Sequence, residues 1–299
     1  IKLIMSSNLI IQNNTMHNVN QGIATSYLSG SLLVQRNRIN AYSKGIEFSG
    51  STISSSGSVH NIYNNIIRVS GYNVYSGNND AAAAGLVIDQ SSYIYAAHNS
   101  IELSSTNSSS IAVHLHGNYN KLRKNHFVNL GSGYVIYFNN VESDNSNHNI
   151  VEFNNIYGKG TNLGKQLNTY YKEISEMNAL FGYSNADYNP FFTDEHLRCT
   201  SPSLDNLGFY VEIDEDFFGN PRSNTAPDIG AHEYSSDPSL TPLAGNYDIG
   251  SGGDFASIND FALALAQRGV SAAVTGLLND ASYSEQIVFD RIPGIGHDR

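Results

Sequence analysis

One six-residue phrase, apolar-x-x-Asn-x-apolar, occurs six times within the first 160 residues of this 299-residue chain. Its copies are IQNNTM (11–16), VQRNRI (34–39), IYNNII (62–67), AAHNSI (96–101), LRKNHF (122–127) and VEFNNI (151–156), with the asparagines Asn14, Asn37, Asn65, Asn99, Asn125 and Asn154. Successive asparagines are 23, 28, 34, 26 and 29 residues apart. A constant phrase at a variable spacing of this size indicates stacked repeats whose insertions leave the stack at corners.

A second phrase, a small residue followed by alternating apolar positions, comes after each of the first five copies. It reads GIATSY (22–27), GIEFSG (45–50), GLVIDQ (85–90), SIAVHL (110–115) and GYVIYF (133–138). Such runs, bounded by Gly, Asn and Ser, are typical of strands. Several short strands per repeat predict an all-β parallel β-helix in which the recurrent asparagines hydrogen-bond along a column. A propeller needs longer repeats, and a sandwich does not repeat one phrase in register.

The strand pattern gives way to a helical one after residue 161. The stretch 163–182 spaces its apolar side chains as a helix does, at Leu167, Tyr170, Tyr171, Ile174, Met177 and Leu180, and Gly182 follows as a stop signal. The spacing therefore predicts a short helix near the C-terminal end of the coil, covering one face or the end of it.

Two later stretches, NPFFTDEHLRCTSPSLDNLG (189–208) and DEDFFGNPRSNTAPDIGAHEY (214–234), carry a family resemblance. With the repeat and the helix before them, they resemble the C-terminal end of secreted bacterial right-handed parallel β-helix proteins of the pectate-lyase-like superfamily. The motif is Asp-x-x-Gly-x-x-Arg followed by Asp-Ile-Gly-Ala-x-Glu, present here as Asp216, Gly219, Arg222, Asp228, Ile229, Gly230, Ala231 and Glu233. The resemblance implies that residues 1–234 are the C-terminal part of a right-handed β-helix from a secreted or cell-surface bacterial protein.

The 220–234 stretch is expected to close the last turn of this coil. The open end of a β-helix exposes strand edges and core, which must be covered. Arg222 can pair with Asp228 or Glu233 to fasten the closing segment. We therefore interpret its cluster of ionisable residues as structural rather than catalytic.

Residues 235–245 hold two prolines and small residues, which predicts a linker. Beyond it, a helix is expected to start with Ser257 as its cap, with Asp260 three positions later, and to end at Gly269. Residues 246–299 look like the N-terminal cap and first turn of a second β-helix that is cut off by the end of the sequence. The chain, which starts without Met, is expected to be a monomeric module of a larger protein.

Charge and composition narrow the choice of partners. The net charge of -11 is uneven, because residues 1–170 hold 10 basic and 7 acidic side chains and the rest hold 6 and 20. Such an acidic chain with few basic clusters argues against nucleic acid. There is no apolar run of 18 residues, so no membrane span is expected, and the single Cys199 offers neither a disulfide nor a zinc site.

The candidate site follows from the outward positions of the second phrase. Aligned on their small residues, the copies place Asp89, His114 and Tyr137 on consecutive turns, with His116 on the same face. The main basic cluster comes directly afterwards and contains Lys121, Arg123, Lys124 and His126. We expect these side chains to line one exposed groove suited to an acidic polysaccharide, with tyrosines stacking on sugars and cations pairing with carboxylates.

Three functions fit such a groove. A noncatalytic polysaccharide-binding, structural or adhesive module is the first interpretation, in keeping with an outer surface of Ser, Asn and Tyr. The alternative is a polysaccharide lyase acting by β-elimination on a uronate-containing glycan, with a Lys, Arg, His or Tyr as the base and Ca²⁺ as a possible cofactor; no other cofactor is evident. A glycoside hydrolase is the weakest, because no pair of acidic residues shares an outward face.

Overall fold

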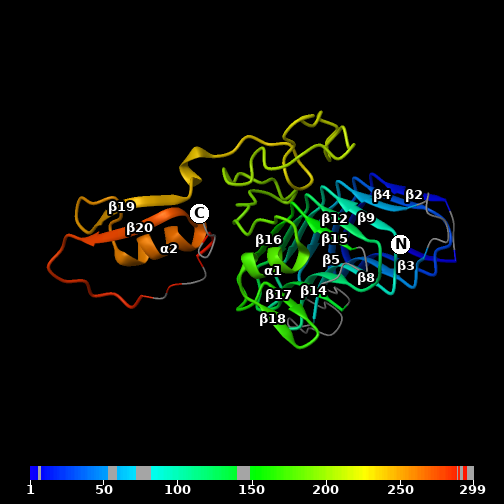
Figure 1. Ribbon diagram of the computed structural model, residues 1–299, viewed down its shortest axis with the longest axis horizontal. Coiled ribbons are helices and arrows are strands. Elements are labelled where there is room, and N and C mark those ends of the chain that lie inside the picture. Colours follow the sequence, from blue (N-terminus) through cyan, green and yellow to red (C-terminus); the bar gives the residue numbers. More distant parts are fainter. Residues whose placement is uncertain are drawn as a thin grey trace.

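Two β-sheets form most of the molecule, and the repeats contribute strands to both (Figure 1). The computed structural model describes residues 1–5, 8–52, 59–71, 82–139, 149–287, 289 and 292–294. A six-stranded sheet contains β2 (Leu9–Gln12), β4 (Leu32–Gln35), β6 (His60–Tyr63), β9 (Ile94–Ala97), β12 (Lys121–Arg123) and β15 (Ile150–Glu152).

A twelve-stranded sheet contains β1 (Lys2–Ile4), β3 (Thr15–Ser26), β5 (Arg38–Ser49), β7 (Ile66–Val69), β8 (Ala84–Asp89), β10 (Ser100–Leu103), β11 (Ile111–Leu115), β13 (His126–Asn129), β14 (Tyr134–Phe138), β16 (Asn155–Gly158), β17 (Gly164–Gln166) and β18 (Thr169–Tyr171). Neighbouring strands in both sheets are parallel, apart from β17 and β18. Strands inside each sheet pair with the equivalent strands of neighbouring repeats, as β9 does with β6 and β12. The all-β prediction is confirmed as two curled sheets in a solenoid-like stack, which we call the coil.

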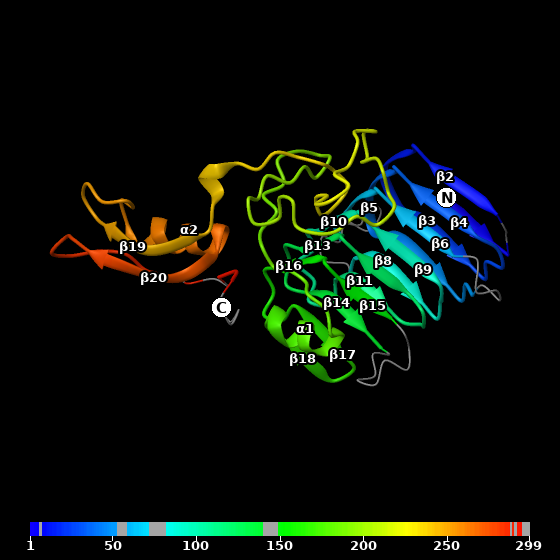
Figure 2. The same ribbon diagram turned by 45° about the horizontal axis from the view of Figure 1, so that its top comes forward.

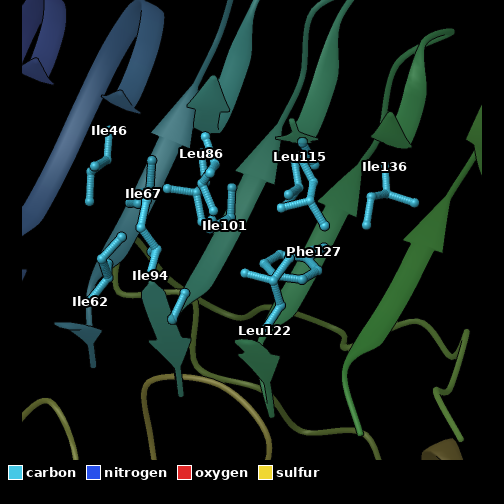
Figure 3. Packing of buried hydrophobic residues seen from close by; sticks show 14 of the residues in the cluster. Ile46, Ile62, Ile67, Leu86, Ile94, Ile101, Leu115, Leu122, Phe127 and Ile136 are labelled. Carbon is cyan, nitrogen blue, oxygen red and sulfur yellow. The ribbon is translucent and has the colours of Figure 1, made fainter. Parts of the chain in front are cut away.

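Aliphatic side chains from both sheets fill the inside of the coil (Figure 3). Equivalent positions stack from one turn to the next, as Ile62, Ala96 and Leu122 do on the six-stranded sheet. On the other sheet, small residues let the strands approach closely. A Cβ atom added to Gly45 would lie 2.3 Å from Ile67 and 2.5 Å from the carbonyl oxygen of Gly85, so the backbone fits there only without a side chain.

The asparagine column predicted from the repeat is confirmed. Each side-chain Nδ2 donates to the Oδ1 of the next asparagine, at 2.9 Å from Asn14 to Asn37 and at 2.9 to 3.1 Å for the later pairs. The column continues beyond the sixth copy through Asn185 to Asn178, which the sequence pattern did not indicate. The buried amides are thus paired along the column, as buried polar groups must be.

The residue before each of the six repeated asparagines has a left-handed backbone. Its φ lies between 51° and 58° at Asn13, Arg36, Asn64, His98, Lys124 and Phe153. This conformation costs a non-glycine residue about 1 kcal/mol or more. The hydrogen bonds of the ladder hold it in every turn, and the side chains of this column meet the segment described next.

The 208–234 segment, which we call the strap, lies along the flank of the coil (Figure 2). Glu215 pairs with Arg36, Arg222 Nη2 donates to Asn64 Oδ1 at 2.9 Å, and the Ala231 amide donates to Ser100 Oγ at 3.0 Å. These partners belong to three successive turns. The expected closure of the last turn by this segment is therefore wrong. The strap instead packs along the side of the coil, where the residues with left-handed backbone form a column.

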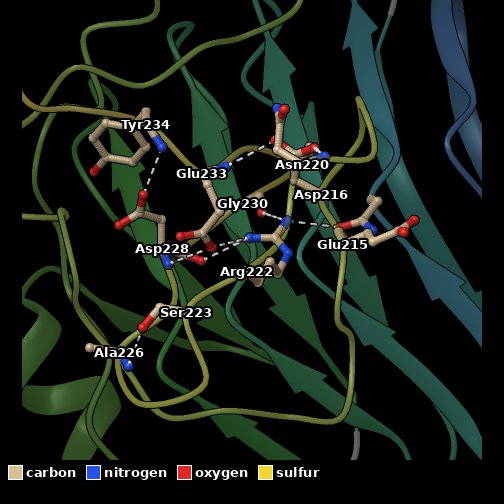
Figure 4. A network of polar contacts seen from close by, with 12 residues as sticks. Glu215, Asp216, Asn220, Arg222, Ser223, Ala226, Asp228, Gly230, Glu233 and Tyr234 are labelled. Carbon is tan, nitrogen blue, oxygen red and sulfur yellow. Dashed lines mark hydrogen bonds and ion pairs between the residues drawn. The ribbon is translucent and has the colours of Figure 1, made fainter.

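Arg222 is the anchor of the strap (Figure 4). Its side chain is fully buried and donates to Glu233 Oε1, Asn64 Oδ1 and the Gly230 carbonyl oxygen, each at 2.9 Å. Asp228 accepts hydrogen bonds from the backbone amides of Asn206 and Tyr234. Burial raises the pKa of Asp228 to about 7. Of the two expected partners of Arg222, Glu233 forms the ion pair.

The end of the coil is covered by helix α1 (Ile174–Phe181). Ile174, Met177 and Phe181 join the core of the coil, and the Phe181 ring lies 5.3 Å from that of Phe138. The helix is shorter than predicted, because residues 164–171 form the antiparallel pair β17 and β18. The spacing of Leu167, Tyr170 and Tyr171 therefore does not reflect a helix, whereas the later part of the stretch does.

The predicted linker 235–245 contains a 3-10 turn (Pro238–Leu240) and ends earlier than predicted, because a small unit begins at Leu243. This unit contains β19 (Leu243–Ile249), α2 (Ile258–Arg268) and β20 (Val270–Leu278), with an apolar cluster of its own. The predicted helix signals are confirmed, since Ser257 Oγ accepts from the Asp260 amide at 3.0 Å and Gly269 follows the last turn. Its assignment as the start of a second β-helix stays a prediction. In the described part of the chain, no helix has the length and apolar character to cross a membrane.

We expect His60 to make the stability of the coil depend on pH. It is fully buried against the Phe48 ring, and burial lowers its pKa to about 4 from a usual 6.5. The unfolded chain binds this proton more tightly than the folded chain does. Above about pH 6.5 the proton therefore costs no stability, and as the pH drops towards 4 the free energy of unfolding falls. Between pH 7 and pH 5 we expect His60 to account for a loss of about 1–2 kcal/mol.

Urea unfolding of wild type and His60→Phe at both pH values measures this contribution. The variant should lose less stability than the wild type on acidification. Equal losses in the two proteins would show that His60 takes no part.

Candidate functional site

The residues expected to line one groove lie on two different sheets. Asp89, His114 and Tyr137 belong to β8, β11 and β14 of the twelve-stranded sheet, and His116 directly follows β11. Lys121 and Arg123 lie on β12 of the six-stranded sheet. The expected single groove is therefore wrong, because residues 116–120 form a corner that takes the chain from one sheet to the other.

The structure also corrects the expected alignment of the turns. His114 stands beside Val87 and Tyr137, whereas Asp89 stands level with His116. The cause is that Ala112, not Ser110, is the small residue next to Gly85, as the strand pairing and the 2.5 Å approach of a Gly85 Cβ to the Ala112 carbonyl oxygen show. A shift of two residues keeps the same side chains outward but changes their neighbours.

Asp89, His114, His116, Tyr137 and Lys165 form a partly exposed cluster that we call the histidine face. His116 Nδ1 lies 2.8 Å from Asp89 Oδ1. The His114 ring lies 6.4 Å from the His116 ring and 5.2 Å from the Tyr137 ring, measured between centroids. Burial lowers the pKa of His114, and the Asp89 charge acts in the opposite direction. The Asp89 carboxylate thus fixes the orientation of His116.

Lys165 is a member of the histidine face that the sequence did not reveal. It pairs with Tyr137 across β14 and β17 and with Tyr170 across β17 and β18. Its ammonium lies 5.2 Å, 5.6 Å and 5.9 Å from the ring centroids of Tyr170, Tyr134 and Tyr137, within the range of cation–π attraction. It was missed because residues 163–182 were predicted to be helical. The short extended run around Lys165 was the signal that could have indicated a strand there.

Lys121 and Arg123 lie in a second concave region, the tyrosine groove, of about 700 Å³ between the six-stranded sheet and residues 209–212 of the strap. Tyr93, Tyr95, Tyr119 and Tyr210 line it as well. The Tyr93 and Tyr119 rings are parallel within 3° with centroids 5.0 Å apart. Arg123 Nη2 lies 2.6 Å from Glu152 Oε1. The basic cluster thus contributes to a site other than the one expected.

The other two residues of that cluster, Lys124 and His126, are buried and reach neither region. Lys124 lies under the strap with its Nζ 4.9 Å from the Phe209 ring centroid, and burial lowers its pKa to about 8. His126 packs against the Phe192 ring, and burial lowers its pKa to about 3. Both side chains serve the contact between coil and strap.

Comparisons of the chain with protein-family models, with curated proteins and with solved structures gave no match. Within the described ranges, no group of three or more His, Cys, Asp or Glu side chains is arranged to hold a metal ion. The geometry of the two regions therefore carries the functional argument.

Proposed function

We propose that the chain is a secreted or cell-surface bacterial module that binds an acidic polysaccharide on its histidine face. The observation that carries this proposal is the row His114, Tyr137, Lys165 and Tyr170, one residue from each of four adjacent strands. Adjacent strands are about 4.8 Å apart, so the row presents ring and cationic groups at short, regular intervals. A linear polysaccharide has a repeated sugar unit, which matches this regular spacing of ring and cationic groups.

The chemistry of the row suits a glycan that carries carboxylates. Tyrosine rings pack on the apolar faces of sugars, and a lysine ammonium pairs with a carboxylate. In the described part of the chain, Lys165 forms no ion pair within 4 Å and so keeps its charge available to a ligand. Lys44, on the same sheet, is paired with Glu47 and so adds no net charge.

The proposal also covers the handedness of the coil and its superfamily. We propose that the coil is right-handed and is the C-terminal part of a pectate-lyase-like β-helix, with residues 246–299 starting a second one. The support is the Asp216 to Glu233 motif together with the asparagine ladder. A solved structure of the chain tests the handedness directly.

Replacing Lys165 should weaken binding of an acidic polysaccharide. Loss of a charge-assisted contact costs about 1.5–3 kcal/mol, so Lys165→Ala should bind about ten-fold or more weakly. Isothermal titration with oligomers of pectate, alginate and glycosaminoglycans measures the effect. Lys172→Ala, which removes an exposed lysine near α1, is the control and should bind as the wild type does. Equal affinity of Lys165→Ala and wild type would remove the histidine face as the site.

A lyase is the second candidate, favoured by the hydrogen bond between Asp89 and His116. An imidazole oriented by a carboxylate can take the proton next to a uronate carboxyl group, and Lys165 can stabilise the negative charge that develops. The electron pair of the broken C–H bond then forms a carbon–carbon double bond while the bond to the leaving sugar oxygen breaks, and that oxygen takes a proton from water, which leaves an unsaturated product.

The lyase hypothesis predicts ultraviolet absorbance from unsaturated products when the chain is incubated with these polymers. His116→Ala should then lower the rate by about 100-fold or more, the range of general-base catalysis, while binding persists. Addition of Ca²⁺ or a chelator tests whether this cation takes part. Binding without any product identifies a noncatalytic module, and the absence of both favours a structural or adhesive role.

A further inference from the structure

We infer that the tyrosine groove is a second, separate binding site and that it takes an uncharged oligosaccharide. It lies on the six-stranded sheet, whereas the histidine face lies on the twelve-stranded sheet. Its volume of about 700 Å³ is within the range of specific ligand sites. The inference does not depend on the function proposed for the histidine face.

The groove is preformed, because the strap is fixed where it forms one wall. Val211 is buried against Ala97 of the sheet, in a cluster that also includes Tyr95. The Phe209 ring meets that of Phe153 edge to face at 4.9 Å and covers the buried Lys124. Because these two apolar contacts already fix the strap, it loses little conformational entropy when a ligand binds. The affinity for the ligand is higher for that reason.

Tyrosines give the floor an apolar surface with hydroxyl groups at its edges. Tyr93 and Tyr119 stack one turn apart, and Tyr119 is 43% exposed. Tyr95 lies in the next outward column and meets Tyr63 edge to face at 6.0 Å. Ring surfaces with polar rims match sugars, which have apolar faces and hydroxyl edges.

The charged side chains of the tyrosine groove compensate one another. Arg123 is neutralised by Glu152 at 2.6 Å. Lys121 and Glu212 both line the groove, one from the sheet and one from the strap. Apart from the Arg123–Glu152 ion pair, the groove thus has one positive group, Lys121, and one negative group, Glu212, and no net charge that would select an anion. Charge complementarity therefore favours a neutral ligand, whose hydroxyl groups these side chains can bind.

A peptide strand is a poorer fit to the same floor. The floor strands β9 and β12 are hydrogen-bonded to neighbours on both sides, β9 to β6 and β12, and β12 to β9 and β15. Their backbones therefore offer no edge for strand addition, the usual mode of extended peptides. Recognition must come from side chains alone, as it does for sugars.

The test is titration of the chain with cello-, xylo- and manno-oligosaccharides, and with uronate oligomers and a proline-rich peptide for comparison. We expect at least one neutral oligosaccharide to bind, with an affinity that salt leaves unchanged. Tyr119→Ala should weaken this binding about ten-fold or more, the cost of losing a central aromatic contact. Tyr183→Ala, which removes a similarly exposed tyrosine next to α1, should have no effect.

The two sites are separated by crossed variants. His114→Ala and Lys165→Ala should leave neutral-sugar binding intact, and Tyr119→Ala should leave uronate binding intact. Unfolding curves for each variant establish that it is folded. Three results would each overturn the inference. The first is that no neutral oligosaccharide binds, and the second is that uronate oligomers bind in a salt-sensitive way that Lys121→Ala abolishes. The third is that the proline-rich peptide alone binds.

Discussion

Replacement of Arg222 by alanine is expected to lower the free energy of unfolding by about 3–5 kcal/mol, the cost of breaking a buried ion pair by removing one partner. Arg222 is fully buried and makes three bonds of 2.9 Å to Glu233, Asn64 and Gly230. Its removal leaves the Glu233 carboxylate without its cation, although the Asp228 amide still donates to it, and it removes the Arg222 donor from the oxygens of Asn64 and Gly230. Urea unfolding at neutral pH measures the loss.

The matched control is Arg198→Ala. Arg198 is half exposed, and its Nε lies 3.5 Å from Asp194 Oδ2, so its loss should cost less than about 1 kcal/mol. Binding of uronate oligomers at the histidine face should survive in folded Arg222→Ala, because that face lies away from the strap. If binding disappeared while stability stayed at the wild-type value, the 220–234 stretch would be a ligand site after all.

Asn99→Ala should produce the second large loss, about 3 kcal/mol or more. Asn99 Nδ2 donates to the carbonyl oxygens of Ile62 and Ala97 and to Asn125 Oδ1, and its own Oδ1 accepts from the amide and side chain of Asn65. The variant leaves several buried polar groups unpaired, each costing about 1–3 kcal/mol before relaxation. Thermal and urea unfolding both report this loss.

Asn14→Ala is the matched control in the same ladder. Asn14 is half-buried at the first rung, and its backbone amide still bonds Asn37 Oδ1 at 3.1 Å after the side chain is removed. We expect a loss of less than about 1 kcal/mol. Equal losses at the two positions would contradict the view that burial of the central rungs makes the ladder stabilising.

The ladder and the all-β repeat could be predicted from the sequence, because stacking forces equivalent residues into equivalent environments. Asn65, Asn99 and Asn125 occupy the same place in each turn, and the phrase around them repeats accordingly. Helix α2 was predictable for a different reason: its start and stop signals, Ser257 and Gly269, act locally. In both cases the information lies in short stretches of the chain.

The candidate site was predicted only in part, because its geometry depends on contacts between turns. Ser110 and Ala112 are both small, and the sequence does not say which one stands beside Gly85, so Asp89 was placed beside the wrong histidine. The number of residues in a corner decides which sheet Lys121 joins. Lys165 lies in an antiparallel pair that resembles a helix in its spacing.

The position of the strap changes how the coil is expected to unfold. In a stack of repeats each turn contacts only its neighbours, so terminal turns can detach one at a time. The strap bonds Arg36, Asn64, Ser100 and Lys124, which belong to four turns, to a single segment of chain. Detaching one of these turns therefore also requires the strap to release it. The strap thus couples these four turns into one cooperative unit.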